Sequence, residues 1–143
     1  MIVKPCTTAD CAELARLNKQ LLEDEGNEKP VTIEGLYLRM EDFLAGEYQA
    51  VFFEQEKEVV GYALVRMTSS PLYLRQFFIC RAHRRQGYGR EAFGRLLEYL
   101  DTDEVDIEVL MANAVGLAFW QSLGFYQNGG VISMRYRGRV NMS

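Results

Sequence analysis

Residues 84–90, RRQGYGR, place two glycines among arginines, directly between an apolar run and a run with helical periodicity. The preceding run, LYLRQFFIC (72–80), is typical of a strand, and the apolar residues after the glycines recur at the period of one helix face: Ala92, Phe93, Leu96, Leu97 and Leu100. In a strand, glycine-rich turn and helix, free backbone N–H groups and the positive end of the helix dipole converge, which suits a phosphate. Gly87 and Gly89 carry no Cβ, so the backbone can approach a ligand oxygen closely. The pattern therefore predicts an α/β fold with an anion site at this turn.

The rest of the chain also alternates between helix-like and strand-like segments. Thr7 and Asp10 form a capping-box pattern before a helix that runs to about Glu23, and Thr32 can begin a second helix that Gly46 ends. Further strands are predicted at 2–6, 48–54, 58–67, 105–111, near 125–128 and at 131–137, and a further helix between Asn113 and Gly124. We expect one domain over residues 1–143, with a mixed, mostly antiparallel sheet of about seven strands flanked by about four helices.

Charge and composition exclude several classes of protein. The formal net charge is −4, whereas duplex binding needs an extended basic face, so we expect no nucleic-acid partner. No apolar stretch reaches the roughly 20 residues of a membrane span, and the first residues do not resemble a signal peptide. We therefore expect a cytoplasmic protein without a membrane partner. The cysteines, Cys6, Cys11 and Cys80, form no Cys-x-x-Cys pair, and the one histidine is His83, so we expect reduced thiols and no metal site.

Basic residues cluster around the glycine-rich turn. Thirteen of the 20 acidic residues precede residue 59, whereas residues 81–90 hold four arginines and no acid. Arginines supply forked donors for a pyrophosphate, although a turn with solvated arginines has the same composition. The segment GYGREA also fits the G-x-G-x-x-G/A fingerprint of dinucleotide-binding domains, with Glu108 21 residues after Gly87. That fingerprint belongs to the first strand–helix turn of a parallel sheet, whereas here a hairpin precedes the turn, so we favour a different family.

Two ordered motifs resemble the Gcn5-related N-acetyltransferase (GNAT) family. The family signature R/Q-x-x-G-x-G/A appears as Arg84-Arg85-Gln86-Gly87-Tyr88-Gly89, after a strand and before an amphipathic helix. A second family block, an Asn after a strand and then A-x-x-F-Y-x-x-x-G-F, is similar to Asn113 and the following LAFWQSLGF. The first strand and helix also look like those of the family, so the resemblance covers nearly the whole chain.

The resemblance implies a site for acetyl-CoA as cosubstrate. In the family, the strand before the glycine loop splays from the next strand, and the pantetheine arm lies in the gap and pairs with strand backbone. One strand N–H would face the thioester oxygen and stabilise the oxyanion. Asn113, Phe119 and Trp120 also have structural alternatives, as a helix cap and as core aromatics. The residues carried over as acetyl-CoA-binding are Phe77, Phe78, Ile79, Arg84, Arg85, Gln86, Gly87, Tyr88, Gly89, Arg90, Asn113, Phe119 and Trp120.

The resemblance also implies a mechanism, from which this sequence departs at one position. A neutral amine attacks the acetyl carbonyl directly, with a base or water relay to remove its proton. Trp120 stands where many relatives have a tyrosine that protonates the departing sulfur, and an indole N–H is not acidic. Protonation of the departing sulfur would then fall to Tyr126 or to solvent. Glu108 is the candidate base, because strand alternation places it with Asp106 on one face, although an exposed edge carboxylate explains the same pattern.

Acidic residues after the first helix bear on the choice of acceptor. Glu23, Asp24, Glu25 and Glu28 follow the first helix, a region that in the family borders the acceptor pocket. A cationic acceptor suits these residues, and a solvated loop is the alternative. The resemblance implies transfer to a primary amine of a small molecule, with a protein or peptide acceptor or a non-catalytic acyl-CoA-binding module as alternatives. Family members often dimerise, and a homodimer could form if the last strand, 131–137, were an exchanged sheet edge.

Overall fold

The computed structural model describes residues 1–26, 29–109, 113–127 and 133–138. Its elements follow the predicted order, and the ends of the predicted strands at 110–111 and 131–132 lie outside the described residues. The elements are β1 (Ile2–Pro5), the 3₁₀ turn η1 (Thr8–Asp10), α1 (Cys11–Asp24), α2 (Ile33–Ala45), β2 (Tyr48–Gln55), β3 (Glu58–Arg66), β4 (Leu72–Ile79), the 3₁₀ turn η2 (Arg81–His83), α3 (Tyr88–Leu100), β5 (Glu104–Glu108), α4 (Ala114–Ser122), β6 (Tyr126–Gln127) and β7 (Ser133–Arg137).

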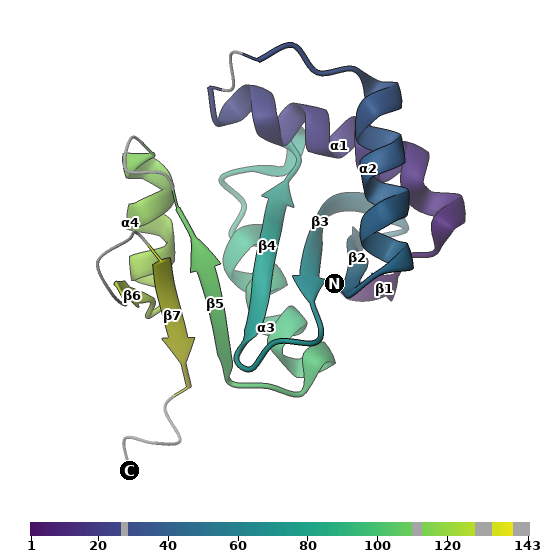
Figure 1. Ribbon diagram of the computed structural model, residues 1–143. Coiled ribbons are helices and arrows are strands. Elements are labelled where there is room, and N and C mark those ends of the chain that lie inside the picture. The colour runs from purple at the N-terminus through teal and green to yellow at the C-terminus, as the bar shows by residue number, and fades with distance from the viewer. Residues whose placement is uncertain (27–28, 110–112, 128–132, 139–143) are drawn as a thin grey trace.

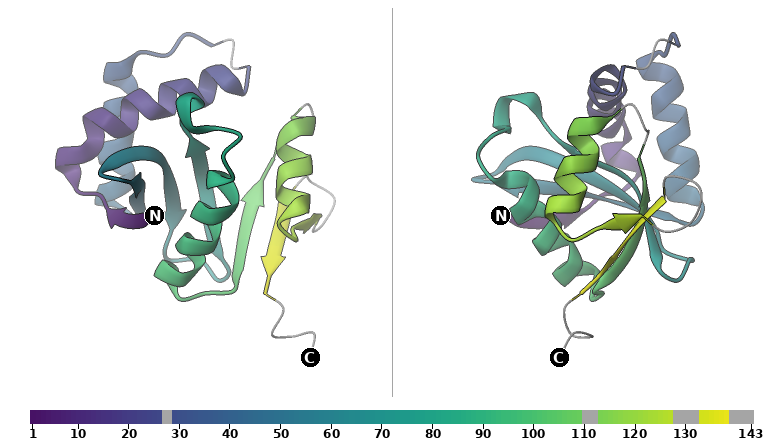
Figure 2. Two further views of the ribbon diagram at one scale, coloured as in Figure 1. Left: turned by 180° about the vertical axis from the view of Figure 1, so that it is seen from behind. Right: turned by 90° about the vertical axis from the view of Figure 1, so that its left-hand side faces the viewer.

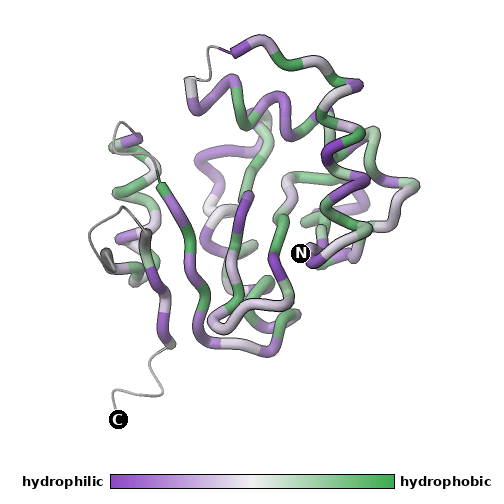
Figure 3. Tube along the Cα trace, in the orientation of Figure 1, coloured by the Kyte–Doolittle hydropathy of each residue, from purple (hydrophilic) through white to green (hydrophobic). Residues whose placement is uncertain are grey.

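Side-chain caps form at the predicted residues, Thr7 and Thr32, although the Thr7 cap begins the 3₁₀ turn η1 that leads into α1 rather than α1 itself. The Thr7 hydroxyl accepts from the N–H of Ala9, and the Asp10 carboxylate accepts from the N–H of Thr7 at 2.8 Å, which completes the capping box. Thr32 accepts from the N–H of Gly35 at 2.9 Å, and α2 ends before Gly46. Figure 3 shows hydrophilic residues recurring between hydrophobic ones along both helices, as expected of helices with one buried face.

The seven strands form one mixed sheet in the order β1-β2-β3-β4-β5-β7-β6. All neighbouring strands are antiparallel except β4 and β5, which are parallel. Figure 1 shows β4 and β5 close together at one end and diverging toward the other. The last strand is not at an edge of this sheet, because β7 lies between β5 and β6. The sheet edges are instead β1 and the short β6.

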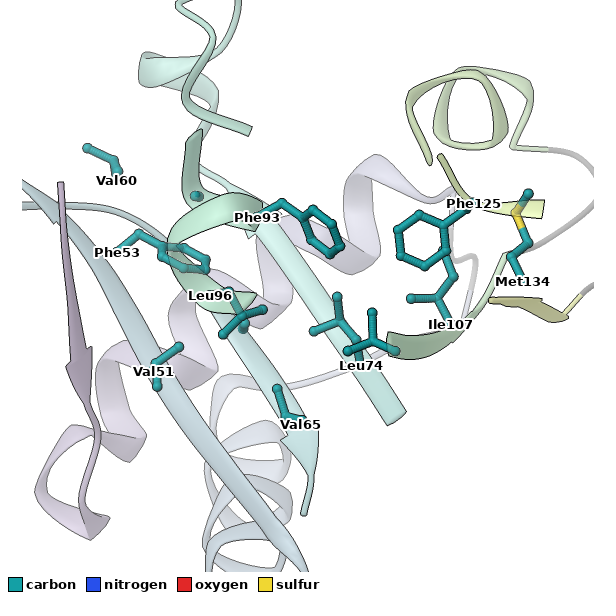
Figure 4. Close-up of a cluster of buried hydrophobic side chains, with 13 residues drawn as sticks. Val51, Phe53, Val60, Val65, Leu74, Phe93, Leu96, Ile107, Phe125 and Met134 are labelled. Carbon is teal, nitrogen blue, oxygen red and sulfur yellow. The ribbon is translucent and has the colours of Figure 1, made fainter. Parts of the chain in front are cut away.

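Helices cover both faces of the sheet, and each face has its own core (Figure 2). On one face, α1 and α2 pack against β2 and β3 through residues that include Leu14, Met40 and Tyr62. On the other face, α3 packs against the sheet, with Leu117 and Trp120 of α4 against the same core. Figure 4 shows this second core, in which Phe93 and Phe125 lie with Leu74 of β4 and Ile107 of β5. The buried residues of the second core are Val51, Phe53, Val60, Ala63, Val65, Leu74, Ala92, Phe93, Leu96, Val105, Ile107, Phe125 and Met134.

None of the helices described in the structure is long and apolar enough to cross a membrane.

A close approach between β3 and β4 fixes the position of the end of β4. A Cβ at Gly61 would lie 2.1 Å from the backbone oxygen of Phe78, closer than any side-chain atom can come. We expect Gly61→Ala to lower the free energy of unfolding by at least about 2 kcal/mol, because the strands must separate to admit the methyl group. Urea unfolding followed by circular dichroism measures this change.

Gly94→Ala is the matched control, because Gly94 lies on the exposed side of α3 and a Cβ there meets nothing within 4 Å. This substitution should instead stabilise the protein by about 0.5–1 kcal/mol, since alanine loses less backbone entropy in a helix. Equal effects of the two substitutions would contradict the close approach at Gly61.

Candidate active site

The parallel pairing of β4 and β5 is short, and a groove lies where it ends. Two residue pairs join the strands, Leu72 with Val105 and Tyr73 with Asp106. Beyond them, β4 continues to Ile79 and pairs only with β3, so the predicted splay of the central strands is confirmed. The groove has a volume of about 1560 Å³ and is lined from both faces of the sheet, by α1, α2 and α4 as well as β4 and β5.

Most of the predicted acetyl-CoA residues line this one groove. It brings together residues from β4, from the glycine-rich loop and from α4: Phe77, Phe78, Ile79, Arg84, Arg85, Gly87, Tyr88, Gly89, Arg90, Asn113, Phe119 and Trp120. Glu108 lines the groove as well. Gln86 lies in the same loop with an exposed side chain that is not part of the lining.

The free backbone edge of β4 can be assigned to individual residues. The N–H of Cys80 donates to the oxygen of Val60 at 2.8 Å, and the oxygen of Phe78 faces Gly61, so Phe78 and Cys80 direct their backbone groups toward β3. Because backbone groups alternate in direction along a strand, those of Phe77 and Ile79 point away from β3 and into the splay. The Ile79 oxygen accepts from Arg84 Nε at 3.0 Å, which leaves the N–H groups of Phe77 and Ile79 and the oxygen of Phe77 facing the groove.

Gly87 and Gly89 have different functions in the loop. Gly87 is the N-cap of α3 with φ +76°, a left-handed conformation that favours glycine, and a Cβ there would meet nothing within 4 Å. The first intrahelical bond runs from the N–H of Glu91 to the Gly87 oxygen, so the N–H groups of the first turn remain available to an anion. Gly89, by contrast, makes room for α4, because its Cβ would lie 3.1 Å from the ring of Phe119.

The arginines of the loop fall into two groups. Asp24, at the end of α1, accepts from Arg81 at 2.8 Å and from Arg84, whose guanidinium also lies 5.2 Å from the centre of the Phe78 ring. Arg84 therefore ties the loop to α1 and β4. Arg85 and Arg90 also line the groove, and within the described part of the chain neither has a carboxylate partner. These two arginines form the cationic wall of the glycine-rich loop.

The same ion pairs change the interpretation of the acidic residues after α1. Glu23 lies 3.5 Å from Arg81, and Asp24 is shared by two arginines, so the charges of both carboxylates are offset by the loop. Glu25 lines the groove, and Glu28 lies outside the described residues. Burial alone would raise the pKa of Asp24, but the hydrogen bonds and charges of Arg84 and Arg81 outweigh burial and hold that pKa below its ordinary value.

Aromatic side chains fill the α4 side of the splay. The Trp120 ring centre lies 5.3 Å from that of Phe77, 5.9 Å from that of Phe93 and 5.1 Å from that of Phe125, so Trp120 is packed in the core while also lining the groove. Phe119 stacks on Phe77 at 6.4 Å. Asn113 is the N-cap of α4, as predicted, and its side-chain oxygen accepts from the N–H of Gly116 at 2.9 Å.

Three carboxylates share one face of β5, and arginines of β7 pair with two of them. Asp106 accepts from Arg135 at 2.7 and 3.0 Å, and Glu104 accepts from Arg137. Glu108 comes next on the same face, lines the groove, and has no ion-pair partner among the described residues. The alternation of side chains along β5 therefore places Glu108, which has no cationic partner among the described residues, at the groove.

Tyr126 lies apart from the predicted site. It is on β6, its side chain is exposed, and it does not line the groove. The structure therefore does not bring Tyr126 together with Glu108 and the glycine loop.

Sequence reasoning missed four polar groove residues on the α1 and α2 side: Tyr73, Arg75, Gln76 and Arg39. Arg75 has no partner residue in β3, because Leu64 pairs with Gln76 and the next residue, Val65, pairs with Leu74. This β-bulge places Arg75 and Gln76 on the same side of the sheet. The bulge could have been predicted from the adjacent polar residues Arg75 and Gln76, which interrupt the apolar alternation of LYLRQFFIC.

Tyr73 is the groove hydroxyl beside Glu108. Burial and the charge of Glu108 raise the pKa of Tyr73. Its phenol can donate a hydrogen bond. Strand alternation places Tyr73 on the face of β4 opposite to the core residue Leu74, and the guanidinium of Arg66 lies 5.5 Å from the centre of its ring.

Comparison with known proteins agrees with this geometry. A family model described as Acetyltransferase (GNAT) family matches residues 13–125. Among solved structures, an acetyltransferase from Thermus thermophilus has a TM-score of 0.75 at 24% identity, covering 94% of each chain. Ribosomal-protein-alanine N-acetyltransferase from Brucella melitensis has a TM-score of 0.69 at 19% identity, over 96% of this chain and 99% of that one. Spermidine N-acetyltransferase from Vibrio cholerae, a dodecamer, has a TM-score of 0.70 at 15% identity, over 99% and 97%.

The family match covers most of the chain, and the strand order and the splay of β4 and β5 fit it. The chain belongs to the GNAT family of acetyltransferases, and as a class it is an N-acetyltransferase enzyme.

The ion pairs of Asp24 predict a pH-dependent contribution to stability. Because the folded-state pKa of Asp24 is lowered, this contribution is complete above the ordinary carboxyl pKa of about 4 and is lost as the pH falls through the folded-state value. We expect Asp24→Asn to lower the free energy of unfolding by about 1 kcal/mol at pH 7 and by progressively less below about pH 4. Urea unfolding at pH 7, 5, 4 and 3 measures the difference.

Asp42→Asn is the control, because Asp42 is exposed on α2 and has no ion pair within the described residues. A loss of stability in Asp24→Asn that stayed constant down to pH 3 would contradict the ion pairs.

Proposed function

We propose that this protein transfers the acetyl group of acetyl-CoA to the primary amine of a small molecule, by direct attack of the amine on the thioester. One observation carries the proposal. A single groove passes through the splay of β4 and β5, with a glycine loop and two arginines on one side of the sheet and a carboxylate without a cationic partner on the other. Because the groove is lined from both faces of the sheet, the two substrates of such a transfer would meet in the splay.

The residues on the α3 and α4 side fit acetyl-CoA. The open space at Gly87 and the N–H groups at the start of α3 suit a pyrophosphate, with Arg85 and Arg90 as charged donors. The pantetheine arm would lie along the free edge of β4 and pair with the oxygen of Phe77 and the N–H of Ile79. When bound, acetyl-CoA supplies the activated acyl group and a thiolate leaving group.

The chain's own residues would then promote attack by the amine. Glu108 would accept the proton of the attacking amine, directly or through a water molecule. The Phe77 N–H, fixed in the strand, would donate to the thioester oxygen as negative charge develops there. Tyr73 would orient the acceptor or the water molecule by a hydrogen bond without losing its proton. The departing thiolate, with an ordinary pKa of about 8.5, needs no protein acid, which agrees with Trp120 lying packed in the core.

The lining of the acceptor side favours an enzyme over a binding module. A binding module would be expected to have a blocked acceptor side, whereas this side is open and walled by the end of α1 and by Arg39 of α2. Similar folds act on different acceptors, as the names of the Brucella and Vibrio enzymes show, so the fold does not choose between a small amine and a peptide. The three free cysteines suit the cytoplasm, where we place the reaction, and a homodimer stays a prediction.

The loop assignment predicts a loss of affinity for acetyl-CoA in Arg85→Gln. Removing one charged donor to the pyrophosphate should raise the Kd about tenfold in low salt and by less at high salt, where the charges are screened. Calorimetric titration with acetyl-CoA measures both values. Arg95→Gln is the control, because Arg95 lies on α3 outside the groove, 3.8 Å from Glu98. An unchanged affinity in Arg85→Gln would contradict the assignment.

Release of CoA thiol in the presence of amino sugars, polyamines, amino acids and short peptides tests the proposed transfer. With an accepted amine, Glu108→Gln should lower kcat/KM by about 10²–10⁴-fold and remove the decline in rate on the acidic side of the pH profile that reflects protonation of the base.

Glu104→Gln is the control for Glu108, since Glu104 shares its face of β5 but pairs with Arg137 and does not line the groove. If Glu108→Gln kept the wild-type pH profile, Glu108 would have no role as a base. If no amine released thiol although acetyl-CoA bound, the proposed transfer itself would be contradicted.

A further inference from the structure

Two arginines line the acceptor side of the groove and stack on the same aromatic ring. The guanidinium carbon of Arg39, on α2, lies 5.2 Å from the centre of the Phe43 ring, and that of Arg75, on β4, lies 5.0 Å from it. Arg75 also donates to the Tyr48 hydroxyl at 3.2 Å and lies 5.8 Å from the centre of that ring. Two segments distant in the sequence thus bring two positive charges together at one end of the groove.

Neither arginine has a carboxylate partner within the described residues, in contrast to most arginines around them. Arg81 and Arg84 share Asp24, Arg135 and Arg137 pair with β5, and Arg66 lies 3.9 Å from Glu47. The groups in contact with the guanidiniums of Arg39 and Arg75 are aromatic rings and one hydroxyl. Both guanidinium carbons lie within 5.2 Å of the same ring centre and neither is neutralised by an ion pair among the described residues, so both can attract a bound oxyanion.

The backbone of β4 holds Arg75 in this place. Arg75 is the extra residue of the bulge between β3 and β4, and a bulge redirects the side chain that it carries. Its neighbour Gln76 accepts from the Tyr62 hydroxyl at 2.8 Å, which fixes the strand on this side of the sheet. Stacking on Phe43 limits the conformations of both guanidiniums, so less entropy is lost when they bind a ligand.

From this arrangement we infer that the acceptor amine carries an oxyanion, a carboxylate or a phosphate, which Arg39 and Arg75 bind by forked hydrogen bonds. The inference rests on the proposed N-acetyl transfer and names its substrate class. Glu108 and Tyr73 lie beside each other on the same side of the sheet as Arg75, so the amine end of the acceptor faces the carboxylate while its oxyanion end faces the arginines. Of the acidic residues that suggested a cationic acceptor, Glu23 and Asp24 are offset by Arg81 and Arg84. Glu25 lines the groove without an ion pair among the described residues, so an acceptor oxyanion must bind away from it, at the arginines.

Matched pairs of amines test the inference. Common L-amino acids are compared with their carboxamides, and O-phosphoethanolamine with ethanolamine, with spermidine as a purely cationic amine. Acetylation is followed by mass spectrometry and thiol release, and binding to protein saturated with CoA by calorimetry. We expect at least a tenfold preference in kcat/KM for the oxyanion-bearing member of at least one pair. The preferred pair distinguishes a carboxylate from a phosphate.

Variants identify the groups responsible for the preference. Arg39→Gln and Arg75→Gln should each raise the KM of the oxyanion-bearing amine about 10- to 100-fold and leave that of its neutral partner nearly unchanged. Arg75→Lys, which keeps the charge and loses the fork, should be intermediate. Arg66→Gln is the matched control, because Arg66 also lies over two aromatic rings, those of Tyr48 and Tyr73, but does not line the groove.

The outcomes separate this inference from the proposed function. Equal rates within every pair, or a preference for spermidine, would overturn the inference while leaving the acetyltransferase intact. Binding of an oxyanion-bearing amine that depends on Arg39 and Arg75, without any acetylation, would support the inference and contradict the proposed transfer. Absence of both binding and acetylation for all oxyanion-bearing amines would overturn the inference.

Discussion

The groove depends on the short pairing between β4 and β5. Two residue pairs are enough to hold the parallel strands in one sheet, and beyond Tyr73 and Asp106 the strands part. A longer ladder would use the backbone groups of Phe77 and Ile79 for the sheet, and no groove could pass between its faces. Aromatic side chains of α3 and α4 fill the space behind the splay, with Phe77 in contact with both Phe93 and Trp120. The opening is thus maintained by packing.

Arginines around the groove have different functions according to their partners. Arg81 and Arg84 hold the glycine loop to the end of α1 through Asp24, and Arg84 also occupies the oxygen of Ile79. Arg85 and Arg90 face the groove on the α3 side without a carboxylate among the described residues. An arginine in a motif can therefore build the site as well as bind a ligand, and only the position of its carboxylate distinguishes the two.

Local chemistry made most of the fold predictable from the sequence. Thr7 with Asp10, Thr32 and Asn113 are caps whose side chains satisfy specific backbone groups, so Thr32 and Asn113 marked the starts of α2 and α4, and Thr7 marked the 3₁₀ turn that leads into α1. The β-bulge at Arg75 was not predicted, because it depends on the register with β3. The partner of Arg84 and the interior position of β7 were missed for the same reason, since each depends on contacts between segments distant in the sequence.

Amide hydrogen exchange with and without acetyl-CoA tests most directly whether the splay is the acetyl-CoA site. If the splay binds acetyl-CoA, acetyl-CoA should slow exchange at Phe77 and Ile79 and at the N–H groups from Arg85 to Arg90. The Phe78 amide is directed toward β3 and should change little. Slowed exchange at another surface, with Phe77, Ile79 and the glycine loop unchanged, would show that acetyl-CoA binds elsewhere.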